Sequence, residues 1–247
     1  MIMSTQMITA ITPTGGRSLA FALCQNWVRN QTVQPDQWIV VDDGIVPLQG
    51  FMPMDYIRRE PQPGEPKPTL LINLKLAIPA ITGDKIIILE DDEYYAPTYI
   101  EELSRRLDSH EVVGVGRSKY YHLPSGGYTV IGNMTHASLA QTSFRSSFLP
   151  KFASLLVGNA YLDMRLWKLA GNRKHLFVDS GAPLYLGIKG LPGRGGIGAG
   201  HNPRIYRAKD TADRGILKQW IPGDCQIYLD ILNGKLTKDT YKEYFGW

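Results

Sequence analysis

The feature that most constrains this chain is a short apolar segment that runs directly into four consecutive acids. Residues 86–89 read I-I-I-L, and they are followed by Glu90, Asp91, Asp92 and Glu93. An unbroken run of β-branched and aliphatic residues predicts a strand that is buried on both faces of a parallel or mixed sheet. The acids then lie at the carboxyl end of this strand, which is where ligands bind in open α/β sheets.

Four neighbouring carboxylates at one strand end repel one another. A hard divalent cation with oxygen ligands relieves this repulsion, and Mg²⁺ or Mn²⁺ suits such ligands. We therefore expect a Mn²⁺ or Mg²⁺ site here. The same residues are also compatible with a solvated acidic turn before a helix, because acids are favoured at helix N-termini. The acids alone leave both interpretations open.

A second strand end carries a similar pattern. Residues 38–41 read W-I-V-V and are followed by Asp42, Asp43 and Gly44. An earlier strand, over 7–11, leads through T-P-T-G-G-R into a helical stretch, so the beginning of the chain predicts a first β/α unit. Asp-Asp-Gly after a strand is also common in ordinary turns. It is informative here because it is the second place in the chain where acids follow a predicted strand.

The remaining elements follow from periodicity and turn residues. Helices are predicted over 69–81, 97–107 and 158–171, and the second of these has Pro near its first turn and acids after it. A short strand is predicted over 112–115, followed by a hairpin in which two aromatic-rich runs flank P-S-G-G. The proline-rich segment 58–68 is predicted to be an exposed connector, because four prolines exclude a regular helix.

Length and composition fit one large α/β domain. The 247 residues are 43% apolar and 20% charged, which is ordinary for a globular protein and argues against global disorder. No apolar run approaches the roughly 20 residues that span a bilayer, and the first residues lack the pattern of a secretory signal. The two cysteines, Cys24 and Cys225, are consistent with a reducing cytosol. We expect a cytoplasmic protein without stable membrane insertion.

The net charge of +4 is unevenly placed. From Lys189 to Lys218 there are seven Lys or Arg residues against two Asp, a local excess of five positive charges. A basic stretch near an active site is suited to the phosphates of a nucleotide sugar, or to a polyanionic acceptor such as DNA. It is equally compatible with a solvated surface that happens to be basic.

Taken in order, these motifs resemble nucleotide-sugar glycosyltransferases of the GT-A fold, in particular the inverting family-2 type. In that family a hydrophobic strand ends in an Asp-x-Asp-like triplet, and Pro, an aromatic residue and an acid follow and open a helix. The triplet here is Glu90-Asp91-Asp92, and Pro97, Tyr99 and Glu101 follow it. The resemblance covers most of the first 200 residues in motif order.

This resemblance implies a fold and a domain organisation. The fold is α/β and Rossmann-like, with a mixed, mostly parallel sheet flanked by helices, a small hairpin and a C-terminal helical region. We expect one glycosyltransferase domain over 1–247, in which 1–116 form the nucleotide-sugar-binding half and 117–247 form the acceptor-binding half.

The resemblance also implies roles for individual residues. Asp92 is the expected direct metal ligand, with Glu90 and His201 as further ligands. Asp179 is the expected catalytic base, at the end of a strand and before a helix. Lys189 and Arg194 are candidates for contact with the diphosphate. The nucleotide sugar is expected to contact the following residues: Thr12, Pro13, Arg17, Asp42, Asp43, Asp91 and Arg194.

Several of these residues fit other roles as well. Asp179 is suited to the N-cap of a helix, and His201 to a packed or surface position. His201 follows a glycine-rich segment, in which residues 193–198 match G-x-G-x-x-G. No buried strand precedes these glycines, and His-Asn-Pro follows where a helix should continue, so we expect a loop and no dinucleotide site.

The function implied is metal-dependent transfer of a sugar from a nucleoside-diphosphate sugar to an acceptor hydroxyl, with inversion. The acceptor is left open between a hydroxymethylated base in DNA, a glycan and a small metabolite. One alternative is a nucleotidyltransferase on a similar α/β core, for which Gly15-Gly16-Arg17 would be the phosphate-binding loop. Another is a non-enzymatic nucleic-acid-binding module, which explains the basic stretch but not the acids at two strand ends.

Overall fold

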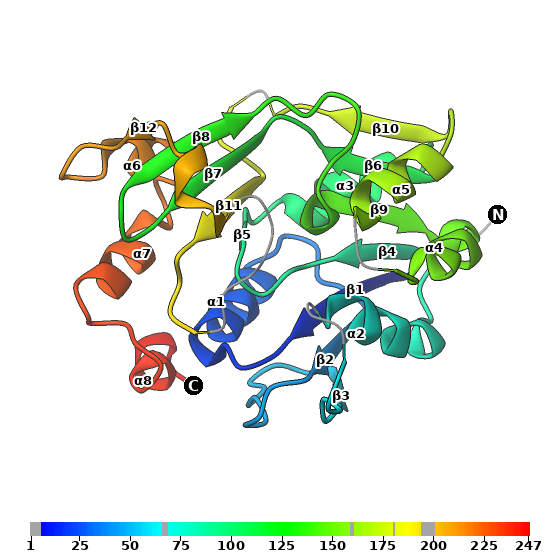
Figure 1. Ribbon diagram of the computed structural model, residues 1–247, viewed down its shortest axis with the longest axis horizontal. Coiled ribbons are helices and arrows are strands. Elements are labelled where there is room, and N and C mark those ends of the chain that lie inside the picture. The colour runs from blue at the N-terminus through cyan, green and yellow to red at the C-terminus, as the bar shows by residue number, and fades with distance from the viewer. Residues whose placement is uncertain (1–5, 66–68, 159–160, 180, 194–200) are drawn as a thin grey trace.

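The computed structural model describes residues 6–65, 69–158, 161–179, 181–193 and 201–247. It is a mixed α/β structure built on two sheets, with helices on both faces of the larger one. Figure 1 shows the smaller sheet beside the upper part of the larger one, and the C-terminal helices along the left side of the molecule.

The larger sheet has seven strands in the order β10-β6-β9-β4-β1-β2-β3. Only β9 is antiparallel to its neighbours, so the other six strands run in one direction and their carboxyl ends share one edge of the sheet. The strands are β1 (Ile8–Thr14), β2 (Gln37–Asp42), β3 (Asp55–Arg58), β4 (Lys85–Ile88), β6 (Val112–Val115), β9 (Thr142–Arg145) and β10 (Lys174–Phe177).

The smaller sheet has five strands in the order β12-β8-β7-β11-β5. The predicted hairpin around P-S-G-G is confirmed, because β7 and β8 pair in an antiparallel arrangement. The strands are β5 (Tyr94–Tyr95), β7 (Ser118–His122), β8 (Gly127–Ile131), β11 (Tyr185–Lys189) and β12 (Ala208–Lys209).

The helices cover both faces of the larger sheet. Residues of α1 and α3 enter one buried apolar cluster, and residues of α2, α4 and α5 enter the other. The α-helices are α1 (Ser18–Arg29), α2 (Leu70–Ala77), α3 (Tyr99–Leu107), α4 (Leu149–Leu155), α5 (Leu162–Leu169), α6 (Gly215–Trp220), α7 (Cys225–Leu232) and α8 (Tyr241–Phe245); the 3₁₀ helices span Ile78–Ala80, Leu139–Gln141, Ser146–Phe148 and Pro203–Ile205.

Strand β4 lies near the middle of the larger sheet and is buried on both faces, as its sequence predicts. Ile87 contributes to the cluster under α1 and α3, whereas Ile86 and Ile88 contribute to the opposite one. All three side chains are completely buried. Full burial of such a side chain stabilises a fold by about 1.5–3 kcal/mol, so the strand that delivers the acids is firmly held.

The C-terminal residues pack on the body of the domain. Trp247 stacks on Phe51 with ring centroids 4.8 Å apart, and Phe245 lies 4.9 Å from Trp247. The guanidinium of Arg29, the last residue of α1, lies 5.4 Å from the centroid of the Trp247 ring. The end of the chain is therefore fixed to the helix that begins beside the acids.

One local prediction is wrong. Asp179 is followed by strand β11 and not by a helix, because Gly181 and Pro183 disfavour a helix start and Y-L-G-I-K pairs between β7 and β5. The connector predicted over 58–68 begins one residue later, because Arg58 ends β3, and residues 59–65 form neither helix nor strand. None of the helices in the described part of the chain is long and apolar enough to cross a membrane.

Candidate active site

Acids from two strand ends meet at the carboxyl edge of the larger sheet. Thr14, the last residue of β1, donates a hydrogen bond from its hydroxyl to Asp91 Oδ2 at 2.6 Å. The backbone carbonyl of the same threonine accepts from the backbone N–H of Asp43 at 3.1 Å. A Cβ at Gly15 would overlap the Asp43 carboxylate, so the turn after β1 requires glycine there. The acids after β2 and after β4 therefore border one site.

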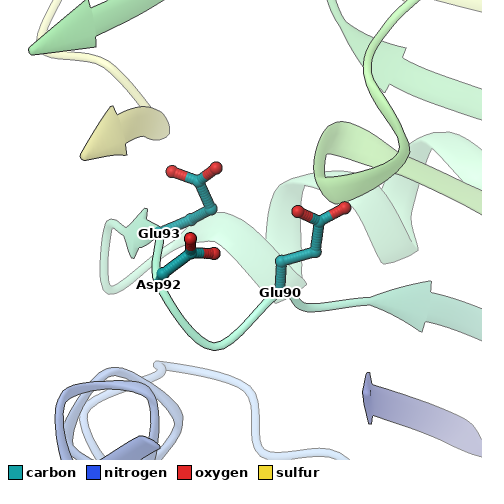
Figure 2. Close-up of side chains that lie close together, drawn as sticks. All are labelled: Glu90, Asp92 and Glu93. Atoms are coloured by element: carbon teal, nitrogen blue, oxygen red, sulfur yellow. The ribbon is translucent and has the colours of Figure 1, made fainter. Parts of the chain in front are cut away.

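Three of the four consecutive acids form a potential metal site. Glu90, Asp92 and Glu93 each place one carboxylate oxygen so that these atoms lie within 4.8 Å of one another. Figure 2 shows the three side chains projecting from the turn between β4 and β5. Carboxylate oxygens are the donors that Mg²⁺ and Mn²⁺ prefer. This cluster can therefore bind a metal ion.

Arg17 joins the two middle acids. It immediately precedes α1 and donates from Nη1 to Asp92 Oδ2 at 2.8 Å and from Nη2 to Asp91 Oδ1. Burial raises the pKa of the Asp91 carboxyl to about 6, although the Arg17 charge opposes this shift. Burial also disfavours ionisation of Asp92, but the charges of Lys189 and Arg17 outweigh it and lower the pKa of Asp92. Asp92 is therefore ionised at neutral pH.

Lys189 supplies a second buried cation. Its ammonium group pairs with Glu93 Oε1, while Glu93 Oε2 accepts from the backbone N–H of Ile188 at 2.9 Å. Both side chains are almost completely buried, at 6% and 2% exposure. Both oxygens of Glu93 are thus occupied, whereas the Glu90 carboxylate makes no hydrogen bond to any residue that the structure describes. Of the three acids, Glu90 and Asp92 are the more available to a cation.

His201 lies beside the same acids. Its Nε2 is 3.9 Å from Asp92 Oδ2. Burial and the nearby charge of Lys189 lower the pKa of His201 to about 4, so the imidazole is neutral at pH 7. Neutral imidazole is the form that binds metals. The predicted diphosphate contact Arg194 lies outside the described residues.

The Asp42 carboxylate holds the loop that follows β2. It accepts from the backbone N–H groups of Gly44 and Leu48 at 2.8 and 2.9 Å, and from the hydroxyl of Tyr56 at 2.6 Å. Asp42 is completely buried. Contact between this carboxylate and a nucleotide would therefore have to add to, or replace, one of these bonds.

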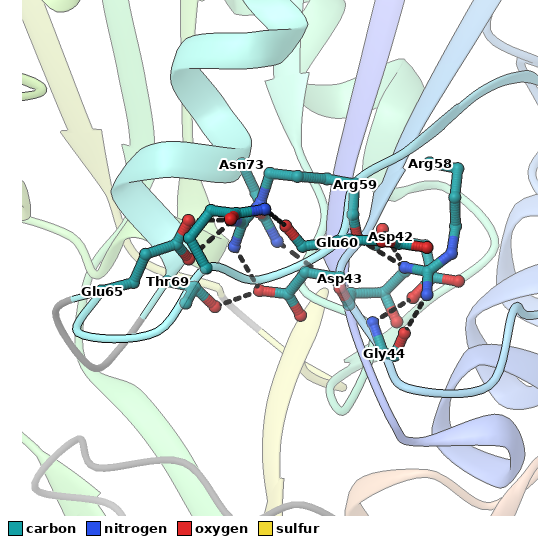
Figure 3. Close-up of polar contacts among 11 residues, drawn as sticks. Asp42, Asp43, Gly44, Arg58, Arg59, Glu60, Glu65, Thr69 and Asn73 are labelled. Carbon is teal, nitrogen blue, oxygen red and sulfur yellow. Dashed lines mark hydrogen bonds and ion pairs between the residues drawn. The ribbon is translucent and has the colours of Figure 1, made fainter.

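Asp43 lies in a separate polar network, which Figure 3 shows together with Asp42. Its Oδ2 accepts from Arg59 Nη2 at 3.1 Å and from the Thr69 hydroxyl. Arg59 also donates to Asn73 Oδ1 at 3.0 Å and to Glu65 at 2.6 and 2.7 Å. No signal in the sequence points to Arg59 or Thr69, because neither belongs to a recognisable motif. The parallel pairing of β2 and β3 brings Arg59 close to Asp43, whereas Thr69 immediately precedes α2.

Two predicted nucleotide contacts lie within β1. Thr12 is completely buried, and its hydroxyl accepts from Trp38 Nε1 at 2.9 Å. Pro13 is also buried and lies opposite Val41 of β2. The hydroxyl of Thr14, one residue further on, is the one that donates to Asp91. Contact of Thr12 or Pro13 with a nucleotide stays a prediction.

Asp179 follows β10 and lies on the same edge of the sheet. Its Oδ2 accepts from the backbone N–H of Leu184 at 3.1 Å, and the carbonyl of Leu184 accepts from the backbone N–H of Ala96, next to β5. Its Oδ1 is buried without a hydrogen-bond partner among the described residues. Burial raises the pKa of Asp179 above its ordinary value, and the hydrogen bond from Leu184 and the charges of Lys119 and Arg106 oppose this shift only in part.

The charges of Asp179 and Glu90 both act on the buried phenol of Tyr99, whose pKa burial raises. The hydroxyl of Tyr95 in turn accepts from the backbone N–H of Glu90 at 2.7 Å. Tyr99 therefore lies within electrostatic reach of both the Asp179 and the Glu90 carboxylates. The expected base and the expected metal ligands border one region of the molecule.

Comparison with solved structures shows that this is a GT-A-like fold, as found in the glycosyltransferase TarS. TarS 1-349 from S. aureus in complex with UDP-GlcNAc matches with a TM-score of 0.54 and 16% identity, covering 95% of this chain and 72% of that chain. TarS 1-349 in complex with UDP matches with a TM-score of 0.53 and 16% identity over 74% and 60% of the two chains.

The similarity concerns the fold and only part of TarS. The match to S. aureus TarS, with a TM-score of 0.54 and 15% identity, spans 74% of this chain and 36% of that chain. A nucleotidyl transferase from Methanothermobacter is a weaker match, with a TM-score of 0.47 and 16% identity over 71% and 88% of the two chains. No protein-family model and no curated protein matches the chain.

Proposed function

We propose that this protein is a glycosyltransferase that uses a nucleoside-diphosphate sugar as donor. The observation that carries the proposal is the acid cluster with its two cations, Arg17 and Lys189, at the carboxyl edge of a GT-A-like sheet, where Asp179 follows a further strand. The matched TarS structures contain UDP and UDP-GlcNAc, which supports a nucleotide-sugar donor.

The proposed donor site extends along the carboxyl ends of β1, β2 and β4. Asp42 and Asp43, with Thr12 and Pro13 beneath them, border the proposed position of the nucleoside. Arg17 is proposed to contact the diphosphate, because a guanidinium is well matched to phosphate oxygens. Asp91 holds Arg17 in place through its ion pair. Arg194 is proposed as a further phosphate contact.

We propose Mn²⁺ or Mg²⁺ as the cofactor. Asp92 and Glu90 would hold the ion, with His201 as a further ligand. The donor set fits, because the oxygens of Asp92 and Glu90 belong to the cluster within 4.8 Å and His201 is neutral beside them. When bound, such an ion offsets the negative charge that develops on a diphosphate leaving group.

Asp179 is proposed to act as the general base. The acceptor hydroxyl gives its proton to Asp179 while its oxygen forms a bond to the anomeric carbon. The bond from that carbon to the diphosphate oxygen breaks, and the nucleoside diphosphate leaves with the electron pair. The raised pKa of Asp179 makes it a stronger base than an ordinary aspartate. Attack from the face opposite the diphosphate inverts the anomeric centre.

A thermal-shift screen tests donor use. Nucleoside diphosphates and nucleotide sugars are each added with and without Mn²⁺, and the melting temperature is measured. At a ligand concentration 100 times its Kd, the free energy of unfolding rises by about 2.7 kcal/mol. We expect a stabilising nucleotide sugar whose effect is larger with Mn²⁺. If no nucleotide sugar stabilises the protein under either condition, the proposal fails.

Two variants in the same screen distinguish the proposed metal ligand, Asp92, from the proposed base, Asp179. Asp92→Asn should lose the metal-dependent part of the stabilisation, whereas Asp179→Asn should retain it. Asp163→Asn, at a partly exposed position on α5, is the matched control and should behave as wild type. If the phenotypes of the Asp92 and Asp179 variants are exchanged, the role assignment is wrong.

A further inference from the structure

A segment of chain leads from the acid cluster to the edge of the smaller sheet. It begins at His201, next to Asp92. Further along, the ring of Tyr206 lies 5.6 Å from that of His122. The segment ends in β12, which pairs with β8 at the edge of the smaller sheet, in the upper left of Figure 1. A ligand bound along residues 201–209 would therefore reach the candidate active site at its His201 end.

This segment presents three cations to solvent. Arg204, Arg207 and Lys209 are exposed, whereas Tyr206 between them is buried at 7% exposure. Across the described ranges of the chain, no ion pair engages any of the three cations. We call these three residues the basic strip. Unpaired cations in a row are suited to a repeated anion such as a phosphodiester backbone.

The acids of this region do not neutralise the basic strip. Asp210 accepts from the hydroxyl of Tyr121 at 2.8 Å and from the backbone N–H of Ile216 at 2.9 Å. Asp213 lies 3.7 Å from the ammonium group of Lys218. Both carboxylates therefore have partners of their own.

Aromatic rings lie beside the basic strip. His122 on β7 is paired with Gly127 of β8, which is paired with Lys209, so His122 and Lys209 project from the same face of the smaller sheet. The ring of His122 lies 5.6 Å from that of Tyr206 and is only partly buried. Nucleobases stack on such rings, and each stacked base contributes about 1–3 kcal/mol of binding energy. The combination favours a nucleic acid over a neutral glycan.

We propose that the basic strip binds a nucleic-acid acceptor whose bases carry a hydroxyl group. The inference rests on the proposed function, since sugar transfer requires such a hydroxyl. The base hydroxyl oxygen forms the bond to the anomeric carbon, its proton goes to Asp179, and the nucleoside diphosphate leaves. A base in a duplex must first be unstacked and flipped out, at a cost of a few kcal/mol. Single-stranded acceptors should therefore be preferred.

The test measures binding of a fluorescent single-stranded oligonucleotide that contains 5-hydroxymethylcytosine, by anisotropy at several salt concentrations. The strip variant is Arg204→Gln, Arg207→Gln and Lys209→Gln together. The control variant, Lys75→Gln, Lys168→Gln and Lys238→Gln together, removes the same charge from exposed positions elsewhere.

For a single strand, each lost phosphate contact changes the slope of log K against log salt by about 0.7. The strip variant should therefore lose about 2 units of slope and on the order of tenfold or more in affinity at low salt. The control variant should bind as wild type does. If both variants lose affinity equally, only net charge matters and the inference fails.

Two activity assays distinguish failure of this inference from failure of the proposed function. Release of nucleoside diphosphate with water as acceptor should be the same in wild type and in the strip variant, because the strip is not part of the donor site. Sugar transfer should occur to the hydroxymethylated oligonucleotide, and neither to its cytosine counterpart nor to a neutral glucan. Transfer to the glucan alone overturns the nucleic-acid inference and leaves the proposed function standing. If the wild-type protein turns over no nucleotide sugar, the proposed function fails. Oligonucleotide binding that depends on the basic strip would still support nucleic-acid binding by these residues.

Discussion

Arg17 Nη1 lies 2.8 Å from Asp92 Oδ2, so the expected metal ligand is paired with a cation of the protein itself. A metal ion at Asp92 has to compete with this guanidinium or use the other carboxylate oxygen. The diphosphate of a donor offers Arg17 a second anion. Donor and metal are therefore expected to favour each other's binding.

The first prediction concerns this competition. Arg17→Met should strengthen Mn²⁺ binding in the absence of a donor, because the competing cation is gone, and should weaken binding of a nucleoside diphosphate. In wild type, the nucleoside diphosphate should tighten Mn²⁺ binding by on the order of tenfold, which is typical for coupled sites. Titration calorimetry measures both effects, with Arg105→Met on the surface of α3 as the control. Weaker Mn²⁺ binding in Arg17→Met would contradict the competition.

The second prediction concerns catalysis by Asp179. Asp179→Asn keeps the shape of the side chain but cannot accept a proton, so turnover should fall by about 10²–10⁴-fold while donor affinity is unchanged. Because burial raises the pKa of Asp179, kcat/KM of wild type should fall on the acid side at a pH above the value near 4 of a free aspartate. Rate measurements over pH check both points. A loss smaller than tenfold would exclude Asp179 as the base.

The third prediction concerns the effect of Asp179 on stability. Its pKa is raised in the folded state, so the folded protein holds this proton more tightly than the unfolded chain. The contribution to stability is present below the unfolded pKa and is lost as pH rises through the folded pKa. Asp179→Asn should therefore be at least as stable as wild type at pH 7, with the difference shrinking toward acid pH. Chemical denaturation at several pH values measures this, and a clearly destabilised variant at pH 7 would contradict it.

The fourth prediction concerns the buried pair of Lys189 and Glu93. Lys189→Met leaves a carboxylate buried without its cation, which typically costs about 3–5 kcal/mol. Adding Glu93→Gln removes that charge and still accepts from the backbone N–H of Ile188, so the double variant should recover most of the loss. A double-mutant cycle by chemical denaturation gives the coupling free energy. Additive effects of the two substitutions would mean that the pair is not formed.

The fifth prediction concerns the C-terminal aromatic cluster. Trp247→Ala removes the stack on Phe51 and the contact with Arg29, and should lower the free energy of unfolding by about 2 kcal/mol. Val130→Ala, at a position 47% exposed on β8, should change it by less than about 0.5 kcal/mol. Thermal and chemical denaturation compare the two. Equal stability of both variants would contradict the proposed docking.

The sequence predicted the parts of the fold that local patterns determine. Strand β4 has an unbroken apolar run because both of its faces are covered, and Val112–Val115 was placed without error for the same reason. The helix expected after Asp179 did not form, because the strand β11 gains partners in β5 and β7 that no local pattern reveals. Short edge elements such as β3 were missed because their pairing depends on distant strands.

The candidate site was predicted only where its residues belong to one motif. The four acids were identified as a cluster, and three of them do lie together. Their partners could not be assigned from sequence, since Arg17 is 74 and 75 residues away from the acids that it contacts. The pairing of Glu93 with Lys189, 96 residues apart, likewise arises from the antiparallel pairing of β5 with β11 in the smaller sheet.

The most direct test of the central claim is the identity of the product released from the donor. The protein is incubated with a nucleotide sugar and Mn²⁺, and the products are separated by ion-exchange chromatography. We expect a nucleoside diphosphate and free or transferred sugar, with release strongly reduced in Asp92→Asn. Formation of pyrophosphate from a nucleoside triphosphate and a sugar phosphate, with no cleavage of any nucleotide sugar, would contradict it.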